Sequence, residues 1–286
     1  MKPYNIFVFI ILCKDFFILE TDAISYTTFL EREQKKHGDL LKTTDIEELK
    51  KHCQDNNLPT NGKEIIMFLH SAMFNVDKAL QYMISNYQYR NKIPEFFKPK
   101  NPFSEEMKEV QKTMSFSIVS RSNAEVHIYS QLKNTNYKNF KFIPTIKYLF
   151  MVIEYIIETQ GTVENFIFTF NTKGIGLWHI GRIQKNIAIE LLNFLKGSLP
   201  IRIKGIYIVN AGKLTSAFLY SLINLMPNNV TKKVKEKVQF FNQKDIFKHV
   251  PKNSIPSEMN GQGKSYITLS DETYNEICEW FLEKKK

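Results

Sequence analysis

The stretch Leu199-Pro200-Ile201-Arg202-Ile203-Lys204-Gly205-Ile206-Tyr207-Ile208-Val209-Asn210 carries the strongest indication of the fold. Its second half, Gly205 to Val209, is a short apolar run typical of a buried strand. A helical segment from Trp178 to Lys196 precedes it, and a strand-like run, Phe166 to Phe170, precedes that helix. Strand, helix and strand in this order predict a crossover between parallel strands. We therefore expect an α/β fold with a mixed, largely parallel sheet flanked by helices.

The earlier part of the chain has the pattern of a small all-helical unit. Behind Asn75, a residue type that caps helix N-termini, apolar residues repeat at helical spacing, and Pro94 ends this helix. The repeating residues are Val76, Ala79, Leu80, Met83 and Tyr87. The predicted organisation is an N-terminal extension (1–38), the helical unit (39–98), an α/β domain (104–264) and a C-terminal tail of a strand and a helix (265–286).

Composition favours a folded chain that meets an anionic surface. Of its 286 residues 43% are apolar, which allows a sizeable core, and the 23 Phe and 13 Tyr suit either an apolar cavity or an aromatic core. The net charge of +10 fits nucleic acid, anionic lipid headgroups or no particular partner. Cys13, Cys53 and Cys278 are odd in number and far apart, so we expect free thiols in a reducing compartment.

The N-terminus leaves two interpretations open. The apolar run Ile6 to Cys13 is broken by Lys14 and Asp15, and is therefore shorter than a membrane span. Thr21 and Ala23 are small residues compatible with a signal-peptide cleavage site, whereas a docking segment fits the run equally well. We expect a cytoplasmic protein that is peripheral at membranes.

No enzyme motif is complete. Gly174-Ile175-Gly176-Leu177-Trp178-His179 lacks the third small residue of a dinucleotide fingerprint. Gly263-Lys264-Ser265 resembles the end of a phosphate loop, but Glu258 stands at the first glycine and a strand-like Tyr266 to Leu269 follows. The histidines show no paired metal-ligand spacing, and no Gly-x-Ser-x-Gly occurs. We expect no catalytic residues, no metal ligands and no cofactor.

Apolar and basic residues are instead combined between Phe166 and Val238. Phe166, Phe168 and Phe170 alternate along a strand, so their rings share one face, either in a plain core or around a cavity. The segment Leu214 to Met226 is apolar on two faces and is followed by a lysine cluster. An apolar helix joined to clustered positive charge is typical of membrane-surface binding. The cluster consists of Lys232, Lys233, Lys235 and Lys237.

These motifs resemble the CRAL-TRIO family of lipid-binding proteins. The matching pieces of the helical unit are Phe68-Leu69-His70, Phe74-Asn75-Val76-Asp77-Lys78-Ala79, Arg90 and Pro94-Glu95-Phe96-Phe97. Those of the α/β domain are Asn171-Thr172-Lys173-Gly174, the stretch from Leu199 to Asn210, and Ile255-Pro256-Ser257-Glu258. Two departures are Asn171, where the family has an acidic residue, and Met259-Asn260-Gly261, where it has Tyr-Gly-Gly.

The resemblance implies a helical subdomain beside a mixed sheet whose floor and mobile gate helix enclose one lipid, with Leu214 to Met226 as the gate. It implies a tocopherol-, retinoid- or phospholipid-like ligand carried between membranes. The pocket residues that we expect are Phe166, Phe168, Phe170, Ile206, Ile208, Phe218 and Leu222.

The resemblance also implies a headgroup site. In a tocopherol-carrying member of the family, basic residues at the positions of Arg202, Lys204, Lys233 and Lys237 bind the phosphates of a phosphatidylinositol bisphosphate. Two other functions stay open. One is a non-catalytic phosphoinositide-binding membrane adaptor with a collapsed pocket. The other, nucleic-acid binding, has only the basic pI of about 9.2 in its favour and no recognised module, so we expect no nucleic-acid partner.

Overall fold

The computed structural model describes residues 25–195, 197–225 and 234–284. The apolar N-terminal run with Cys13, and the lysines at 232 and 233, lie outside the described residues. Within the described ranges, no helix combines the length and the apolarity needed to cross a bilayer.

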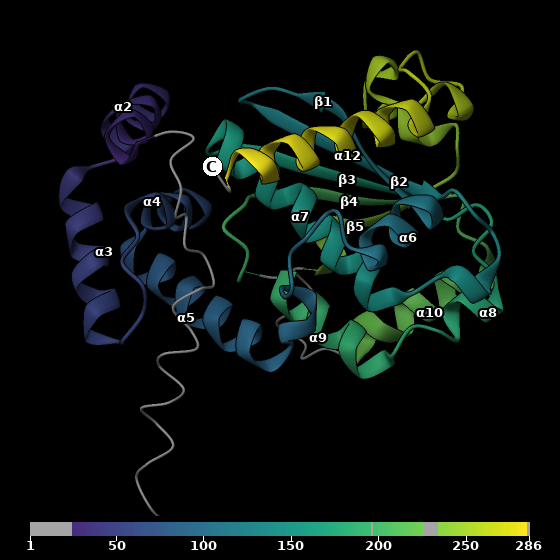
Figure 1. Cartoon of the computed structure of the whole chain (residues 1–286), viewed down its shortest axis with the longest axis horizontal. Coiled ribbons are helices and arrows are strands. Elements are labelled where there is room, and N and C mark those ends of the chain that lie inside the picture. The colour runs from purple at the N-terminus through teal and green to yellow at the C-terminus, as the bar shows by residue number, and fades with distance from the viewer. Residues whose placement is uncertain (1–24, 196, 226–233, 285–286) are drawn as a thin grey trace, which may run out of the picture.

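In the part of the chain that the structure describes, the helical unit consists of four α-helices (Figure 1). Asn75 caps the last of them, because its side chain accepts a hydrogen bond from the N–H of Lys78 at 2.8 Å. The first helix falls inside the predicted N-terminal extension. The bounds are α2 Tyr26–His37, α3 Thr43–Asp55, α4 Gly62–Ser71 and α5 Val76–Lys92, with 3₁₀ turns η1 Gly38–Leu40 and η2 Pro94–Phe96.

The sheet has five strands in the order β1-β2-β3-β4-β5. The first pair is antiparallel and the other pairs are parallel, so the predicted mixed, largely parallel sheet is confirmed. Across β3 and β4, Phe168 lies opposite Ile206 and Phe170 opposite Ile208. The strands are β1 Met114–Arg121, β2 Glu125–Leu132, β3 Asn165–Asn171, β4 Ile203–Val209 and β5 Val238–Phe241.

Helices cover the sheet and connect its strands. The C-terminal helix α12 (Tyr266–Glu283), yellow in Figure 1, lies across the sheet, where it contacts β1 and α7. The other helices are α6 Glu105–Thr113, α7 Phe142–Gln160, α8 Leu177–Ile180, α9 Lys185–Leu195 and α10 Lys213–Asn224. Short 3₁₀ turns are η3 Tyr137–Asn139, η4 Asp245–Lys248, η5 Lys252–Ser254 and η6 Ser257–Met259.

Two sequence predictions about elements are wrong. The helix expected from Trp178 to Lys196 is two helices, α8 and α9, separated by a turn that begins at Gly181, a weak helix former. The strand expected at Tyr266 to Leu269 is the first turn of α12. Here the oxygens of Glu258 accept hydrogen bonds from the Ser265 hydroxyl and, at 3.2 Å, from the N–H of Tyr266. A carboxylate therefore occupies the helix N-terminus where a phosphate loop would hold its anion.

One apolar core runs through both the helical unit and the α/β domain, joining for example Ile46 and Phe68 to Phe116 and Phe166. Helix α7 is buried along most of its length. Two of its charged residues, Lys147 and Glu154, are buried too, and Lys147 is 2.7 Å from a carboxylate oxygen of Glu106. The shared core fixes the helical unit against the sheet, and this junction holds the pocket described next.

Candidate functional site

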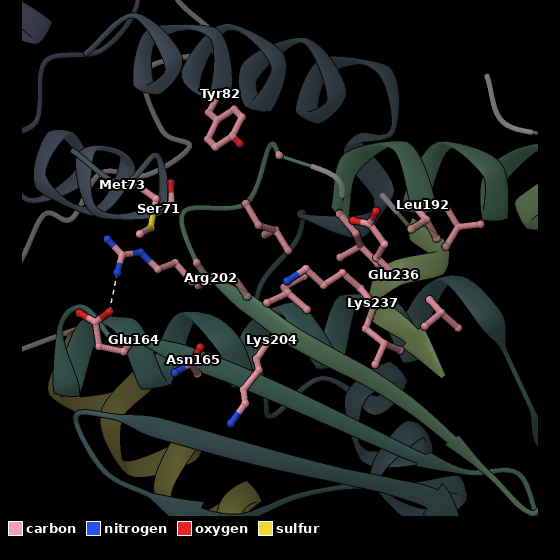
Figure 2. A pocket seen from close by; sticks show the side chains of 18 of the residues that line it. Ser71, Met73, Tyr82, Glu164, Asn165, Leu192, Arg202, Lys204, Glu236 and Lys237 are labelled. Atoms are coloured by element: carbon pink, nitrogen blue, oxygen red, sulfur yellow. Dashed lines mark hydrogen bonds and ion pairs between the residues drawn. The ribbon is translucent and has the colours of Figure 1, made fainter. Parts of the chain in front are cut away.

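An open pocket of about 580 Å³ lies where the helical unit meets the sheet. Its walls come from the end of α4, the first turns of α5, the starts of β3 and β4, helix α9 and residues 234–238 (Figure 2). Close packing shapes one wall, because a Cβ atom on Gly197 would lie 2.7 Å from the Tyr82 ring. A side chain at this place would displace the Tyr82 ring.

Four cations and two carboxylates line this pocket. Three of the cations, Arg202, Lys204 and Lys237, are residues predicted to bind a headgroup. The fourth predicted residue, at position 233, lies outside the described residues. Sequence reasoning missed Lys78, whose ammonium lies 5.4 Å from the Tyr82 ring centroid.

Arg202 is the most constrained of the cations. Its Nη1 forms an ion pair with Glu164, drawn as the dashed line in Figure 2, and its Nε donates to the carbonyl of His70 at 2.7 Å. Its Nη2 is buried without a hydrogen-bond partner in the described part of the chain. One donor of the guanidinium is therefore unpaired, although it is shielded from solvent in this structure.

The other cations are more accessible. Lys204 pairs with Glu125 at 2.9 Å, with half of its side chain exposed. Lys78 and Lys237 are exposed. Exposed ammonium groups form weak ion pairs that an anionic ligand can displace.

The carboxylate of Glu164 contacts two histidines as well as Arg202. Its Oε1 is 3.2 Å from Nε2 of His70 and 3.6 Å from Nδ1 of His37. Burial, together with the charge of Arg202, lowers the pKa of His70 to about 4. Burial alone would raise the pKa of Glu164, but the hydrogen bond from His70 and the charge of Arg202 bring it below its usual range.

Of the seven predicted apolar pocket residues, the open pocket is lined by one, Ile206. Phe166, Phe168 and Phe170 stack along β3 with ring centroids 6.2 and 6.4 Å apart, and the first two are buried. Ile206, on the neighbouring strand, lines the open pocket. The remaining predicted residues are Ile208 and Leu222, which are buried, and Phe218, which is half-buried.

Helix α10, the predicted gate, has an inner and an outer apolar side. Ile223 packs with Leu192 and Val234, and these two partners also line the open pocket. On the outer side, Leu214 and Leu225 are 61% and 54% exposed. The predicted gate extends to Met226, and this last residue lies outside the described part.

Helix α8 adds to this exposed apolar surface. Leu177 and Trp178 are 58% and 68% exposed, and α8 contacts α10. Large apolar side chains exposed on adjoining helices are typical of a surface that binds a partner or a membrane.

Comparison with known families identifies the fold. Residues 120–261 match the CRAL/TRIO domain, and residues 40–107 match the Pinta-like UBA domain. The chain is a CRAL/TRIO-domain protein. The resemblance read from the sequence is thereby confirmed, and family membership indicates a lipophilic ligand.

Similar proteins are known in mammals. Alpha-tocopherol transfer protein-like of Mus musculus is 22% identical over 215 residues, which are 72% of this chain and 60% of that relative. Tyrosine-protein phosphatase non-receptor type 9 of Homo sapiens is 22% identical over 235 residues, 80% of this chain and 37% of the phosphatase. The chain thus spans between 37% and 60% of the length of these two relatives. The crystal structure of Sfh5 superposes with a TM-score of 0.49 at 12% identity, covering 93% of this chain and 99% of that one.

Proposed function

We propose that this CRAL/TRIO-domain protein binds a hydrophobic small molecule and carries it between membranes without a catalytic step. The observation that carries the proposal is that the basic pocket adjoins the inner side of α10. Leu192 and Val234 line the pocket and also pack against Ile223 of α10. A headgroup held in the pocket would act directly on the helix proposed as the gate.

The headgroup that suits this pocket is a phosphoinositide carrying several phosphates. Cations from α5, β4 and residues 234–238 line one pocket, and the exposed ammonium groups among them can donate to phosphate oxygens. The exposed Leu214, Leu225 and Trp178 would then enter the lipid surface. Binding at the headgroup would hold α10 at the membrane and favour its opening.

The hydrophobic ligand would lie beside the stacked phenylalanines of β3 and the buried side of α10. A ligand that buries roughly 400 Å² of apolar surface gains about 10 kcal/mol relative to water. That gain is large enough to retain the ligand in solution, so release requires the gate to open at a membrane. The proposed lining residues are those predicted from the sequence, Phe166, Phe168, Phe170, Ile206, Ile208, Phe218 and Leu222.

A second candidate function is a phosphoinositide-binding adaptor without a carried lipid. The stacking of Phe166 and Phe168 inside the main apolar core favours it, because these rings already have apolar neighbours. Both candidates use the same basic pocket.

Native mass spectrometry of the purified chain, before and after organic extraction, distinguishes them. A carrier releases one lipid per chain and then moves a fluorescent lipid from donor to acceptor vesicles. A chain that contains no stoichiometric lipid and transfers none, yet binds phosphoinositide vesicles, is an adaptor, and the carrier proposal fails.

A further inference from the structure

Two histidines and a carboxylate that are far apart in the sequence meet beside the basic pocket. His37 is the last residue of α2, His70 lies in the last turn of α4, and Glu164 directly precedes β3. One ligand atom from each lies within 4.8 Å of the others. Two histidines and one carboxylate are a ligand set found in zinc sites.

The two distances from Glu164 to the histidines suit a small metal ion. Tetrahedral zinc with bonds of 2.0–2.2 Å places its ligand atoms about 3.3 Å apart. Oε1 of Glu164 is 3.2 Å from His70 Nε2 and 3.6 Å from His37 Nδ1. Because Arg202 binds the other oxygen, Oε2, only Oε1 faces the histidines, and a metal ion there would replace the proton that His70 Nε2 shares with it.

Hydrogen bonds outside the cluster set the orientation of His37. The Thr162 hydroxyl donates a hydrogen bond to Glu33, so it can only accept one from Nε2 of His37, which lies 2.7 Å away. Nε2 therefore carries the ring proton, and Nδ1 directs a lone pair toward Glu164. Metal-binding histidines are usually oriented in this way, by a partner on the second ring nitrogen.

The surroundings hold this orientation in place. Glu33 is fully buried, and Lys36 donates to it at 3.1 Å. The chain turns at Gly161 with φ +78, where a Cβ atom would run into the Glu33 carboxylate, so a glycine lets Thr162 approach. The facing lone pairs of Nδ1 and Oε1 repel each other unless a cation lies between them.

We propose that His37, His70 and Glu164 form a binding site for a divalent transition-metal ion of the zinc class. The positive charges of Arg202 and Lys36 oppose a further cation, so we expect weaker binding than at a structural site of four thiolates. A bound ion would join α2 to α4 and to the start of β3. The proposal rests on these contacts and is independent of the proposed lipid carriage.

The test is titration of the chelator-treated full chain with Zn²⁺ by calorimetry and with Co²⁺ by visible absorption. We expect one ion per chain and, in His37→Ala and Glu164→Gln, an affinity lower by about tenfold or more. The control is His52→Gln on α3, because His52 also lies beside a carboxylate, 3.6 Å from Glu48, but outside the cluster. It should bind the ion as the wild type does.

Glu164→Gln should leave the fold intact, because the Glu164 side chain is 43% exposed. Circular dichroism verifies the fold of each variant. Absence of stoichiometric binding by the wild type would overturn the proposal. Equal affinities in the wild type, both variants and the control would overturn it as well.

Discussion

Reversing the charges of Lys78 and Lys237 is the sharpest perturbation of the basic pocket. Both side chains are exposed on its wall, so replacing them with glutamate should leave the fold intact. Arg202 is unsuitable for this test. A glutamate at its position, where the side chain is 14% exposed, would face Glu164 and damage the fold.

The expected loss follows from the charge at the surface. A lysine near an anionic membrane contributes about 1 kcal/mol, and its reversal replaces attraction with comparable repulsion. Two reversals therefore cost about 4 kcal/mol at low ionic strength, which is about a thousandfold in affinity. At physiological ionic strength, with a screening length of about 8 Å, the loss should be smaller.

Sedimentation with vesicles that contain phosphatidylinositol bisphosphate measures this loss. The matched control reverses Lys42 and Lys51, two exposed lysines that do not line the pocket and that change the net charge equally. If the pocket variant binds like the wild type, or loses no more affinity than the control does, the assignment of the headgroup site is refuted.

Three further substitutions test other parts of the structure. Phe168→Asp should abolish lipid retention while Phe168→Leu keeps most of it, because the ring is 4% exposed within the stack and an unpaired carboxylate there is costly. Native mass spectrometry measures the lipid content of each variant. Retention of lipid by the Asp variant would place Phe168 outside the cavity. Burial raises the pKa of Glu64 to about 7, so the folded state keeps a proton that the unfolded state loses, and stability should fall as pH rises from about 4.5 to 7. Urea unfolding of Glu64→Gln at several pH values should show a smaller fall in the free energy of unfolding between pH 4.5 and 7, by at most about 3 kcal/mol. The same fall in the wild type and the variant would contradict a raised pKa of Glu64. Trp178→Ala should alter the free energy of unfolding by no more than about 0.5 kcal/mol, because the ring is 68% exposed. The same substitution should weaken binding to vesicles. Equal vesicle binding by the variant and the wild type would show that α8 is not part of the membrane-binding surface.

The order of strands and helices could be predicted where burial and sequence pattern agree. β3 and β4 are apolar runs because helices cover the sheet, and their parallel pairing follows from the helical connection. β1 was not predicted, because Ser115 and Ser117 alternate with its apolar residues and resemble a solvated face. Both serines are fully buried, and Ser117 donates to the carbonyl of Tyr266 at 2.8 Å on α12. When the hydrogen-bond partner of a buried polar residue lies on a distant helix, the neighbouring sequence does not show that the residue is buried.

The candidate site was predictable only in part for the same reason. Arg202 directly precedes β4 and Lys204 lies on it, both within a recognisable motif, so family resemblance identified them. Lys78 follows the Asn75 cap and, in the sequence, resembles any exposed lysine of a helix. The approach of His37 to Glu164 depends on the packing of α2, a helix that the prediction left in an undefined extension.

Glu164 connects the two proposed sites. One of its oxygens binds Arg202 in the headgroup pocket, and the other faces His70 and His37. Any ligand that changes the charge at one oxygen therefore alters the electrostatic environment of the other. A metal ion at the histidines would weaken the hold of Glu164 on Arg202 and leave that guanidinium freer to donate to a phosphate. Metal and headgroup binding should for this reason favour each other, and by linkage each must raise the affinity of the other by the same factor.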